Sequence, residues 1–384
     1  MGYIDIQNRE DIDTLISETL SQYFSQTIKI SKEYSSNTFI LNPRLNAART
    51  NVASKSVILA IQKGHAVYRN IFLYWLMRIY ISIAFSKKGH FHCKYIEFEK
   101  LPQVANELLI MPGNMKIKIF NYKNNSVVNL VKPGFSNIPF EKEKIIRIKP
   151  LWDFVLPMIC LKSSNGYEER LLNGYSIDRC PFNLQKKYAE NIKQIILTIQ
   201  KAGREEQNTS KYTKHVIDKI QVILEKIYIK TNVQKSIKAF CDLILTFCKS
   251  EKILLACSHG DLQMGNIFIE TNGKLWILDW ETHDIRSLGY DLLTYYYSFR
   301  YRRDYVSRIK SFLDDKVFEQ KFSTFYDGMI PSSSHLLAVY LLEDILWVSE
   351  ECAYTNEHRP SQSLLQYADE GFQRTIIKLL EQSA

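Results

Sequence analysis

Residues 257–281 read CSHGDLQMGNIFIETNGKLWILDWE and hold most of the chemically informative residues of the chain. The segment begins with His259-Gly-Asp261, places Asn266 five residues after that Asp, and closes on Asp279. The residues between Asn266 and Asp279 have the pattern of two short strands joined at Asn272-Gly273, a dipeptide typical of β-hairpins. This order of loop, hairpin and second acid predicts that the three polar side chains lie close together.

These three residue types suit phosphoryl transfer from a nucleotide. An Asp in a loop accepts or orients the acceptor hydroxyl, while an Asn and a second Asp hold Mg²⁺ against the phosphate oxygens. Asp261 and Asn266 share one loop, so a single backbone bend can aim both side chains. The alternative is a plain turn at Asp261 and a surface cap at Asp279, but the combined string argues against coincidence.

The string His259-Gly-Asp-Leu-x-x-x-Asn-Ile, followed by Leu278-Asp279-Trp-Glu281 and Arg286-x-x-Gly289-Tyr-Asp291-Leu-Leu, resembles the aminoglycoside phosphotransferase and choline kinase-like family. The resemblance covers about residues 107–350 and is strongest from 257 to 293. It implies a two-lobed protein-kinase-like fold, with Asp261 as the catalytic base and Asn266 and Asp279 as magnesium ligands. It further implies that Asp291 braces the catalytic loop and that His259 supports the loop by hydrogen bonding.

Departures from protein kinases favour a small acceptor. Gly260 stands where they carry an Arg, Trp280-Glu281 replaces Phe-Gly, and Gln263 replaces the lysine of Ser/Thr kinases. We therefore expect a phosphotransferase that uses ATP (or GTP) and Mg²⁺ and phosphorylates an alcohol group of a sugar, aminoglycoside-like compound or amino alcohol. The alternatives are a protein-directed kinase, an AMP transferase of the same fold, or a non-catalytic nucleotide-binding scaffold at a membrane surface.

Changes of hydrophobic period divide the chain and predict an α+β fold. Residues 1–105 are expected to be a helical extension of unknown role, with helices near 12–24, 52–62 and 70–85. Residues 106–175 show short β-type runs and a single helix, as in a small antiparallel nucleotide-binding lobe. Residues 176–384 form a helical lobe with the catalytic loop and the acceptor site.

A kinase-like lobe needs a strand lysine on the nucleotide phosphates and a helix glutamate that holds this lysine. Lys132, after the run Val127–Val131, is our candidate, with Glu143 as its partner. Lys116 and Lys118 compete for the lysine role, and Glu141 is nearly as good a glutamate. The loop 111–114, with Gly113, is expected to cover the phosphates, and the hinge from Glu169 to Leu171 to contact adenine through its backbone.

The acceptor site has the weakest signal. The helical pattern around residues 341–354 places Glu343, Trp347, Glu350 and Tyr354 on one face, and an acidic aromatic face suits a cationic or sugar-like compound. Glu281 is a further candidate for the acceptor site. A solvent-exposed acidic face with Trp347 in the core is the favoured alternative.

The 384 residues include 50 Lys and Arg against 41 Asp and Glu, a net charge of +9 that favours anionic partners. We attribute the lysine-rich helices after residue 181 to solvated faces, and we expect no specific nucleic acid. Seven cysteines without a C-x-x-C pair favour a reducing cytoplasm over a disulfide framework. No motif indicates an oligomeric state.

The most apolar segment runs from Ile71 to Phe85 and contains Arg78. It is shorter than the ~20 residues that span a bilayer. A helix packed on the rest of the protein explains it better than a helix lying on an anionic bilayer, although Arg69, Lys87 and Lys88 at its ends keep the second hypothesis open. Peripheral contact with the inner face of a membrane thus stays an alternative.

Overall fold

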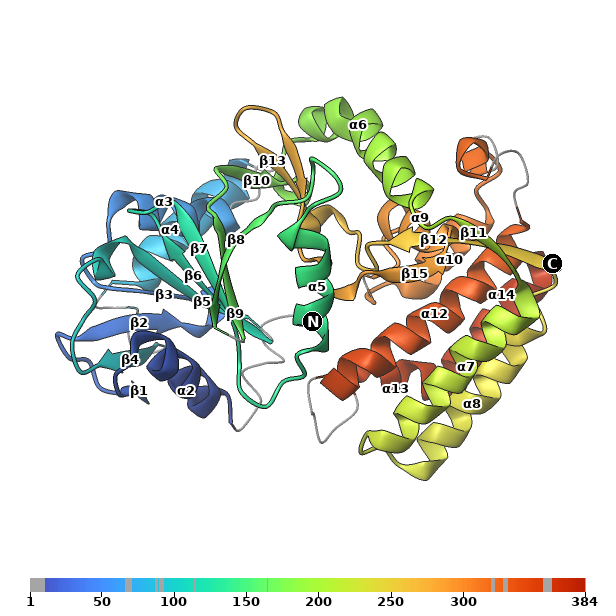
Figure 1. Ribbon diagram of the computed structural model, residues 1–384, viewed down its shortest axis with the longest axis horizontal. Helices are drawn as coiled ribbons and strands as arrows, with labels where there is room; N and C mark the ends of the chain where they lie inside the picture. Colours follow the sequence, from blue (N-terminus) through green and yellow to red (C-terminus); the bar gives the residue numbers. More distant parts are fainter. Residues whose placement is uncertain are drawn as a thin grey trace. The chain divides into compact units, whose positions relative to one another are not determined.

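The computed structural model describes residues 11–65, 71–86, 89, 93–113, 115–163, 165–300, 302–318, 322–326, 331–354 and 361–383. The chain divides into two compact units. Unit 1 comprises Met1–Lys187 and Ile267–Leu278, and unit 2 comprises Tyr188–Asn266 and Asp279–Ala384. Unit 1 contains a large antiparallel sheet and unit 2 is mainly helical, which confirms the predicted α+β class (Figure 1). The boundary expected after residue 175 falls inside unit 1.

Unit 1 is built on one nine-stranded sheet in the order β1-β4-β2-β3-β5-β6-β7-β9-β8, and all neighbouring strands are antiparallel. Strand β7, which lies between β6 and β9, is buried along its whole length and rich in Val, as expected for a strand covered on both faces. The strands are β1 (Ile28–Ser31), β2 (Thr38–Asn42), β3 (Ala47–Arg49), β4 (Lys94–Phe98), β5 (Leu108–Pro112), β6 (Lys116–Asn121), β7 (Ser126–Val131), β8 (Met158–Ser163) and β9 (Gly166–Arg170).

The first 105 residues differ from the helical extension that we expected. The helix predicted at 12–24 is present as α2 (Ile12–Phe24), and the next two occur as α3 (Lys55–His65) and α4 (Ile71–Ala84). Strands β1 to β4 also come from this region and extend the sheet of residues 108–170. The extension is therefore part of unit 1, because the edge of β5 is completed by β3 rather than left open.

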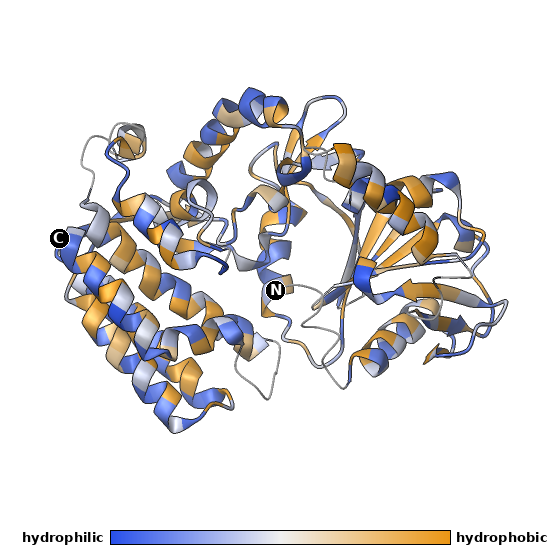
Figure 2. Ribbon diagram, turned by 180° about the vertical axis from the view of Figure 1, so that it is seen from behind, coloured by the Kyte–Doolittle hydropathy of each residue, from blue (hydrophilic) through white to orange (hydrophobic). Residues whose placement is uncertain are grey.

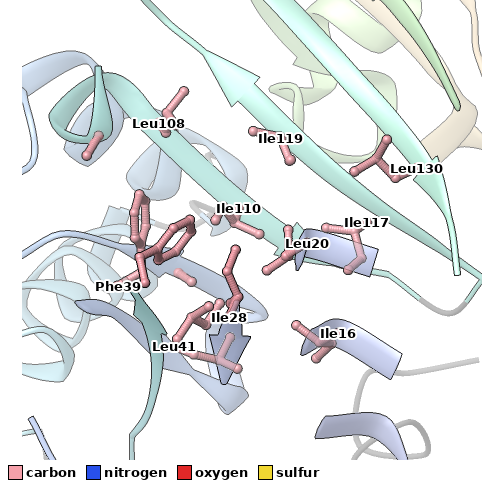
Figure 3. Packing of buried hydrophobic residues seen from close by; sticks show 14 of the residues in the cluster. Ile16, Leu20, Ile28, Phe39, Leu41, Leu108, Ile110, Ile117, Ile119 and Leu130 are labelled. Carbon is pink, nitrogen blue, oxygen red and sulfur yellow. The ribbon is translucent and has the colours of Figure 1, made fainter. Parts of the chain in front are cut away.

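Two apolar clusters cover the sheet. One joins α2 to the strands through Ile16, Leu20, Phe39, Ile110 and Ile117, which lie together in Figure 3. The other packs α3 and α4 against the sheet. The strands of the sheet are mostly apolar in Figure 2, which agrees with covering on both faces. The helix α5 (Ile138–Ile148) contributes Phe140 to a third, smaller cluster.

A second, small sheet of unit 1 has the order β10-β13-β14, from β10 (Gly174–Ser176), β13 (Ile267–Glu270) and β14 (Leu275–Ile277). The predicted hairpin is thus present, and Gly273 in its turn has φ +88°, a conformation that favours glycine. Ile267 pairs with Ile277, so the first residue of β13 and the last residue of β14 lie next to each other.

Unit 2 combines a three-stranded sheet, in the order β11-β12-β15, with helices. Its longest helix, α12 (Ser333–Tyr354), is buried on nearly all sides, which makes it the core element of the unit. The other elements are β11 (Glu205–Asn208), α7 (Thr209–Lys226), α8 (Thr231–Leu245), β12 (Lys252–Ser258), β15 (Asp284–Ser287), α9 (Gly289–Tyr296), α10 (Tyr305–Leu313), α13 (Gln362–Ala368) and α14 (Glu370–Ser383), while α6 (Phe182–Lys201) contains the division between the units.

Helix α4 is more exposed than a core helix. Only Ile81 and Ala84 are buried, and Met77 and Tyr80 are half-buried against the apolar cluster, while seven other large apolar side chains stand 46–70% exposed. The exposed set comprises Ile71, Phe72, Leu73, Trp75, Leu76, Ile79 and Ile83. The favoured prediction of a packed helix therefore holds for one side of α4 alone. Among the described residues, no helix has the length and apolar character needed to cross a bilayer.

Candidate active site

The loop after β12 is clamped by one carboxylate. The backbone N–H of His259 donates to Asp291 Oδ2 at 2.7 Å, and that of Gly260 donates to Oδ1 at 3.1 Å. Gly260 has φ +81°, and a Cβ at this position would lie 2.2 Å from the carbonyl oxygen of Thr282. Only glycine fits here, which gives a physical reason for the absence of the arginine found in protein kinases.

Asp261 is held in place from several directions. Asn266 Nδ2 donates to its backbone carbonyl at 2.8 Å and to Oδ2 at 3.0 Å. Gln263 Nε2 also donates to Oδ2 at 3.0 Å, and Arg300 Nε forms an ion pair with Oδ1 at 3.1 Å. The Asp261 side chain keeps 21% of its surface exposed. A carboxylate fixed by its neighbours and still open to solvent can receive a hydroxyl proton.

Arg300, which was not predicted from the sequence, connects Asp261 to helix α12. Its guanidinium donates to Asp344 Oδ1 at 2.7 Å and to Tyr290 Oη at 2.6 Å, and it also donates to the carbonyl of Gly260. It lies over the ring of Trp347 at 3.5 Å. Burial opposes the charge of Arg300, but the neighbouring tyrosines and acids raise its pKa, so it stays cationic.

Asp344 shares this network with a second arginine. Arg302 Nη2 donates to Asp344 Oδ2 at 2.6 Å, and the Tyr367 hydroxyl donates to the same oxygen. An acid in the middle of an apolar helix requires such partners, and Asp344 in the run 336–348 is the signal that could have predicted a buried cation here.

Two further predicted site residues are His259, which precedes Asp261 in the sequence, and Asp279, which follows it. The ring of His259 is fully buried, and its Nδ1 accepts from the backbone N–H of Asp261 at 3.3 Å, the contact expected of a supporting residue. Asp279 adopts the left-handed conformation at φ 59°, which has a cost in backbone energy for a residue with a Cβ but which Asp tolerates better than most residues.

Asn266 and Asp279 could hold a magnesium ion. Each lies within two residues of the Ile267–Ile277 pair of the hairpin. Both contacts of the Asn266 amide use Nδ2, and no donor among the described residues reaches its Oδ1. An amide oxygen and a carboxylate are hard ligands, and phosphate oxygens and water would complete the octahedron. Within the described part of the chain, no group of three or more His, Cys, Asp and Glu side chains forms a metal cluster.

Unit 1 contains a separate cluster of buried charges around Glu143 on α5. Its carboxylate accepts from Lys116 Nζ at 2.5 Å, from Arg147 Nη1 at 2.6 Å and from the Tyr167 hydroxyl at 3.0 Å. Burial alone would raise the pKa of Glu143, but the two cations hold it well below the ordinary value. Arg147, one helical turn after Glu143, was missed, and its i,i+4 spacing is the signal that could have indicated it.

The lysine partner of Glu143 is therefore Lys116 on β6, and the pairing with Lys132 was wrong. Lys132 is buried and donates to the carbonyl oxygen of Gly113 at 2.5 Å. Gly113 closes the turn from β5 to β6 by donating to the Lys116 carbonyl at 2.7 Å. Met111 and Pro112 of the expected phosphate loop belong to β5, while Asn114 lies outside the described residues.

The expected hinge is more constrained than we predicted. Glu169 lies in β9, where its carboxylate accepts from Asn129 Nδ2 at 3.0 Å and from Arg147. The backbone N–H of Leu171 donates to the carbonyl of Asn125 at 2.8 Å. Because that donor is already used, Leu171 does not offer its N–H to adenine.

The five acceptor candidates do not form one acidic face, and Tyr354 is half-buried at the end of α12. Glu343 is buried, and it accepts from Ser287 N at 2.6 Å and from Tyr212 Oη at 2.5 Å. Burial raises the pKa of Glu343. Trp347 covers Arg300, while Glu350 and Glu281 are half-buried. Glu343 thus joins α12 to β15 and α7, so neither the predicted face nor its exposed alternative describes this helix.

Comparisons with known proteins find structural likeness alone. No family model and no curated protein sequence matches the chain. A choline/ethanolamine kinase family protein from Mesorhizobium loti is 12% identical, with a TM-score of 0.45, over 73% of this chain and 94% of that one. The ethanolamine kinase of Plasmodium vivax is 13% identical, with a TM-score of 0.42, over 87% and 96%. An aminoglycoside phosphotransferase in complex with AMP-PNP and hygromycin B is 10% identical, with a TM-score of 0.47, over 72% and 94%.

Proposed function

We propose that the chain is a phosphotransferase that moves the γ-phosphoryl group of ATP to a hydroxyl of a small molecule. The observation that carries this proposal is the loop 259–266 of unit 2. There Asp261 is oriented by Asn266, and the backbone before it is clamped by Asp291. A fixed carboxylate beside a metal-ligating amide is the arrangement that phosphoryl transfer requires.

In the proposed reaction Asp261 orients the acceptor hydroxyl and takes its proton. The acceptor oxygen then bonds to the γ-phosphorus, and the bond from this phosphorus to the β,γ-bridging oxygen breaks and leaves ADP. The proton passes from Asp261 to solvent. Gln263 and Arg300 keep the carboxylate in one orientation, so most of its contribution is positioning.

Asn266 Oδ1 and the Asp279 carboxylate are the proposed ligands of Mg²⁺. The ion, when bound, neutralises charge on the phosphate oxygens. The two residues occupy the ends of the β13–β14 hairpin, whose pairing fixes how far apart their backbones can lie. The strained backbone of Asp279 fits a side chain that must point in one direction.

In unit 1 we assign the phosphate-binding lysine to Lys116. A lysine in this role is held by a helix glutamate, and Glu143 meets that description with Lys116 and not with Lys132. Lys132 instead supports the turn at Gly113. Replacing Lys116 by Met is expected to raise the KM for ATP and lower kcat, whereas Lys132→Met should act mainly on stability. Steady-state kinetics of the two variants decide between them, and a larger ATP effect for Lys132→Met would restore the original assignment.

The acceptor is proposed to be a sugar, an aminoglycoside-like compound or an amino alcohol. The direct experiment is a screen for ATP consumption over these three classes, with the native chain, Asp279→Ala and Asp284→Ala as a matched control on β15. We expect acceptor-dependent ADP release that Asp279→Ala abolishes and Asp284→Ala retains. Intact-mass shifts of +80 Da on a protein, or larger shifts from AMP transfer, would indicate the alternative acceptors. ATP that binds and is never turned over would favour a scaffold.

A second candidate function is peripheral contact with an anionic membrane through α4. Seven large apolar side chains of this helix are exposed, more than isolated surface residues explain. Arg78 lies over the rings of Trp75 at 5.1 Å and Tyr74 at 5.6 Å. Aromatic rings and an arginine on an apolar helix fit the headgroup region, and the net charge of +9 favours anionic lipid.

Co-sedimentation with vesicles tests this second function. The native chain is expected to bind vesicles that contain phosphatidylserine and to bind pure phosphatidylcholine several-fold less. Ile79→Glu should abolish binding, while Ile145→Glu, at an even more exposed isoleucine on α5, should not. Equal binding of the two variants would contradict the assignment to α4.

A further inference from the structure

The segment that carries helices α3 and α4 contains no acidic residue. Residues 34–96 hold nine Lys and Arg and no Asp or Glu, although acids make up 41 of the 384 residues of the chain. From the rest of the described chain, Asp13 pairs with Lys94 at 2.7 Å, and Glu107 accepts from Ser54 Oγ at 2.8 Å. The other basic side chains that the structure describes in this segment form no ion pair with a described acid. The segment therefore carries a positive charge that is largely uncompensated.

Arg49 on β3 is half-buried and belongs to this segment. Its Nη1 donates to the carbonyl oxygen of Thr50 at 3.0 Å, and its guanidinium lies 4.6 Å from the centre of the Phe85 ring. Burial lowers the pKa of Arg49, but an arginine in this position still carries its charge at pH 7. A cation that has lost part of its hydration and has no carboxylate beside it gains more from an anionic ligand than a fully solvated one.

Two nitrogen atoms of Arg49 are open to a ligand. Within the described residues, Nε and Nη2 have no hydrogen-bond partner, and neither is among the unpaired side-chain atoms that the fold encloses. These two atoms form one edge of the planar guanidinium, and such an edge pairs with two oxygens of a phosphate group. Phe85 covers one face of the guanidinium and Thr50 occupies Nη1, so the open edge is held in one orientation.

Arg49 lies near one end of the exposed apolar side of α4. Phe85 follows directly after this helix, which ends at Ala84, and packs into the same apolar cluster as Ile81 and Ala84. Ile83, two residues before Phe85, is 53% exposed. An apolar helix side with an arginine close to its end matches the boundary of a bilayer, where the phosphate groups lie next to the hydrocarbon.

We propose that Arg49 binds the phosphate group of an anionic phospholipid through Nε and Nη2 while α4 lies in the same leaflet. The inference rests on the second proposed function, the membrane contact of α4, and adds to it the chemical group that is recognised. Nucleic acid would match the charge of residues 34–96 but would leave the seven apolar side chains of α4 in water. A bilayer satisfies both, because it presents many anionic groups above hydrocarbon.

Replacement by lysine separates a phosphate site from a general effect of charge. Arg49→Lys keeps the charge but loses the two-donor edge, so binding to vesicles that contain phosphatidylserine should weaken about five- to tenfold in co-sedimentation. Arg44→Lys, at an exposed arginine of the turn Pro43–Leu45, is the matched control and should bind as the native chain does. Native affinity in Arg49→Lys overturns the proposal and leaves the membrane contact of α4 intact. No binding of the native chain overturns both.

Two further measurements complete the test. If thermal melting shows that Arg49→Lys does not fold, the pair Arg49→Gln and Arg44→Gln decides: Arg44→Gln loses one charge, worth about fivefold at most, and Arg49→Gln should lose clearly more. Equal losses overturn the proposal. At constant ionic strength, millimolar inorganic phosphate should not displace the native chain from the vesicles. Displacement, or tighter binding to duplex DNA than to the vesicles, would assign Arg49 to a soluble phosphate or to nucleic acid and overturn the proposal.

Discussion

Glu143 in unit 1 and Arg300 in unit 2 are each the centre of a cluster of buried charges, and the signs of the charges are opposite in the two clusters. Glu143 is an anion between two cations, Lys116 and Arg147, whereas Arg300 is a cation between two anions, Asp261 and Asp344. All three side chains of the Glu143 cluster are at most 7% exposed. The Arg300 cluster ends on Asp261, whose side chain is 21% exposed.

The difference separates two uses of buried charge. An enclosed cluster fixes side chains in place, because each charge depends on its partners for the solvation that water no longer provides. In a cluster that reaches the surface, the buried partners also fix the orientation of one exposed group. The cluster in unit 1 thus fixes the Lys116 side chain, and the cluster in unit 2 fixes the solvent-accessible carboxylate of Asp261.

The largest expected effect on stability comes from breaking the enclosed cluster. Glu143→Gln leaves Lys116 and Arg147 without their common anion, and we expect a loss of about 3–5 kcal/mol in the free energy of unfolding. Glu141→Gln on the same helix removes only an exposed pair with Lys144 and should cost about 0–1 kcal/mol. Urea unfolding of both variants gives the comparison. Equal losses would show that the cluster is not the source of stability.

Arg300→Met tests the open cluster through activity. Asp344 keeps Arg302 and Tyr367, and Asp261 keeps Asn266, so the fold should persist while the carboxylate loses its fixed orientation. We expect kcat to fall about 10²-fold, as for other misplaced catalytic groups, with the KM for ATP unchanged.

The control for this prediction is Arg303→Met, at a side chain that is 95% exposed. It should leave kcat within a factor of two, and Arg300→Lys should recover part of the loss. If Arg300→Met has the same kcat as the native chain, Arg300 does not position Asp261 for the reaction.

The smallest effect is a pair of opposite pH dependences at two buried glutamates. The pKa of Glu143 is lowered on folding, so its contribution is present above pH 4.5 and is lost as the pH falls through the lower folded value. The pKa of Glu343 is raised, so its contribution is full below pH 4.5 and is lost as the pH rises through the higher folded value.

The native chain should therefore exceed Glu143→Gln in free energy of unfolding by an amount that grows as the pH rises from 4 to 6. The corresponding difference between the native chain and Glu343→Gln should shrink over the same range. Each unit of pKa shift corresponds to about 1.4 kcal/mol. Thermal or urea unfolding across this range measures both differences. Slopes of the same sign would contradict the assigned shifts.

The parts of the site that could be predicted rest on short spacings. Asp261 and Asn266 are five residues apart, and their hydrogen bond follows from a single loop. The clamp by Asp291 was expected from the resemblance, and it appears as two backbone hydrogen bonds. Helix α2 was predicted with its observed bounds because its apolar residues keep a helical period.

The missed parts depend on strand register and distant contacts. Lys116 and Lys132 flank adjacent strands, and only the pairing of Lys116 with Val131 determines which lysine reaches Glu143. Strands such as β3, with three residues, are too short to show a period. Arg300 lies in an irregular segment, and its acid partner Asp344 is far along the chain.

The central claim is that Asp261 serves as the base of a phosphoryl transfer, and single-turnover product formation tests it most directly. With an acceptor from the screen, native chain and Asp261→Asn would be mixed with ATP and Mg²⁺, and ADP and phosphorylated acceptor measured together. The account predicts equal amounts of both products from the native chain and a rate about 10²–10⁴-fold lower in the variant, with ATP affinity retained. Phosphorylated acceptor formed at the same rate by both chains would contradict it.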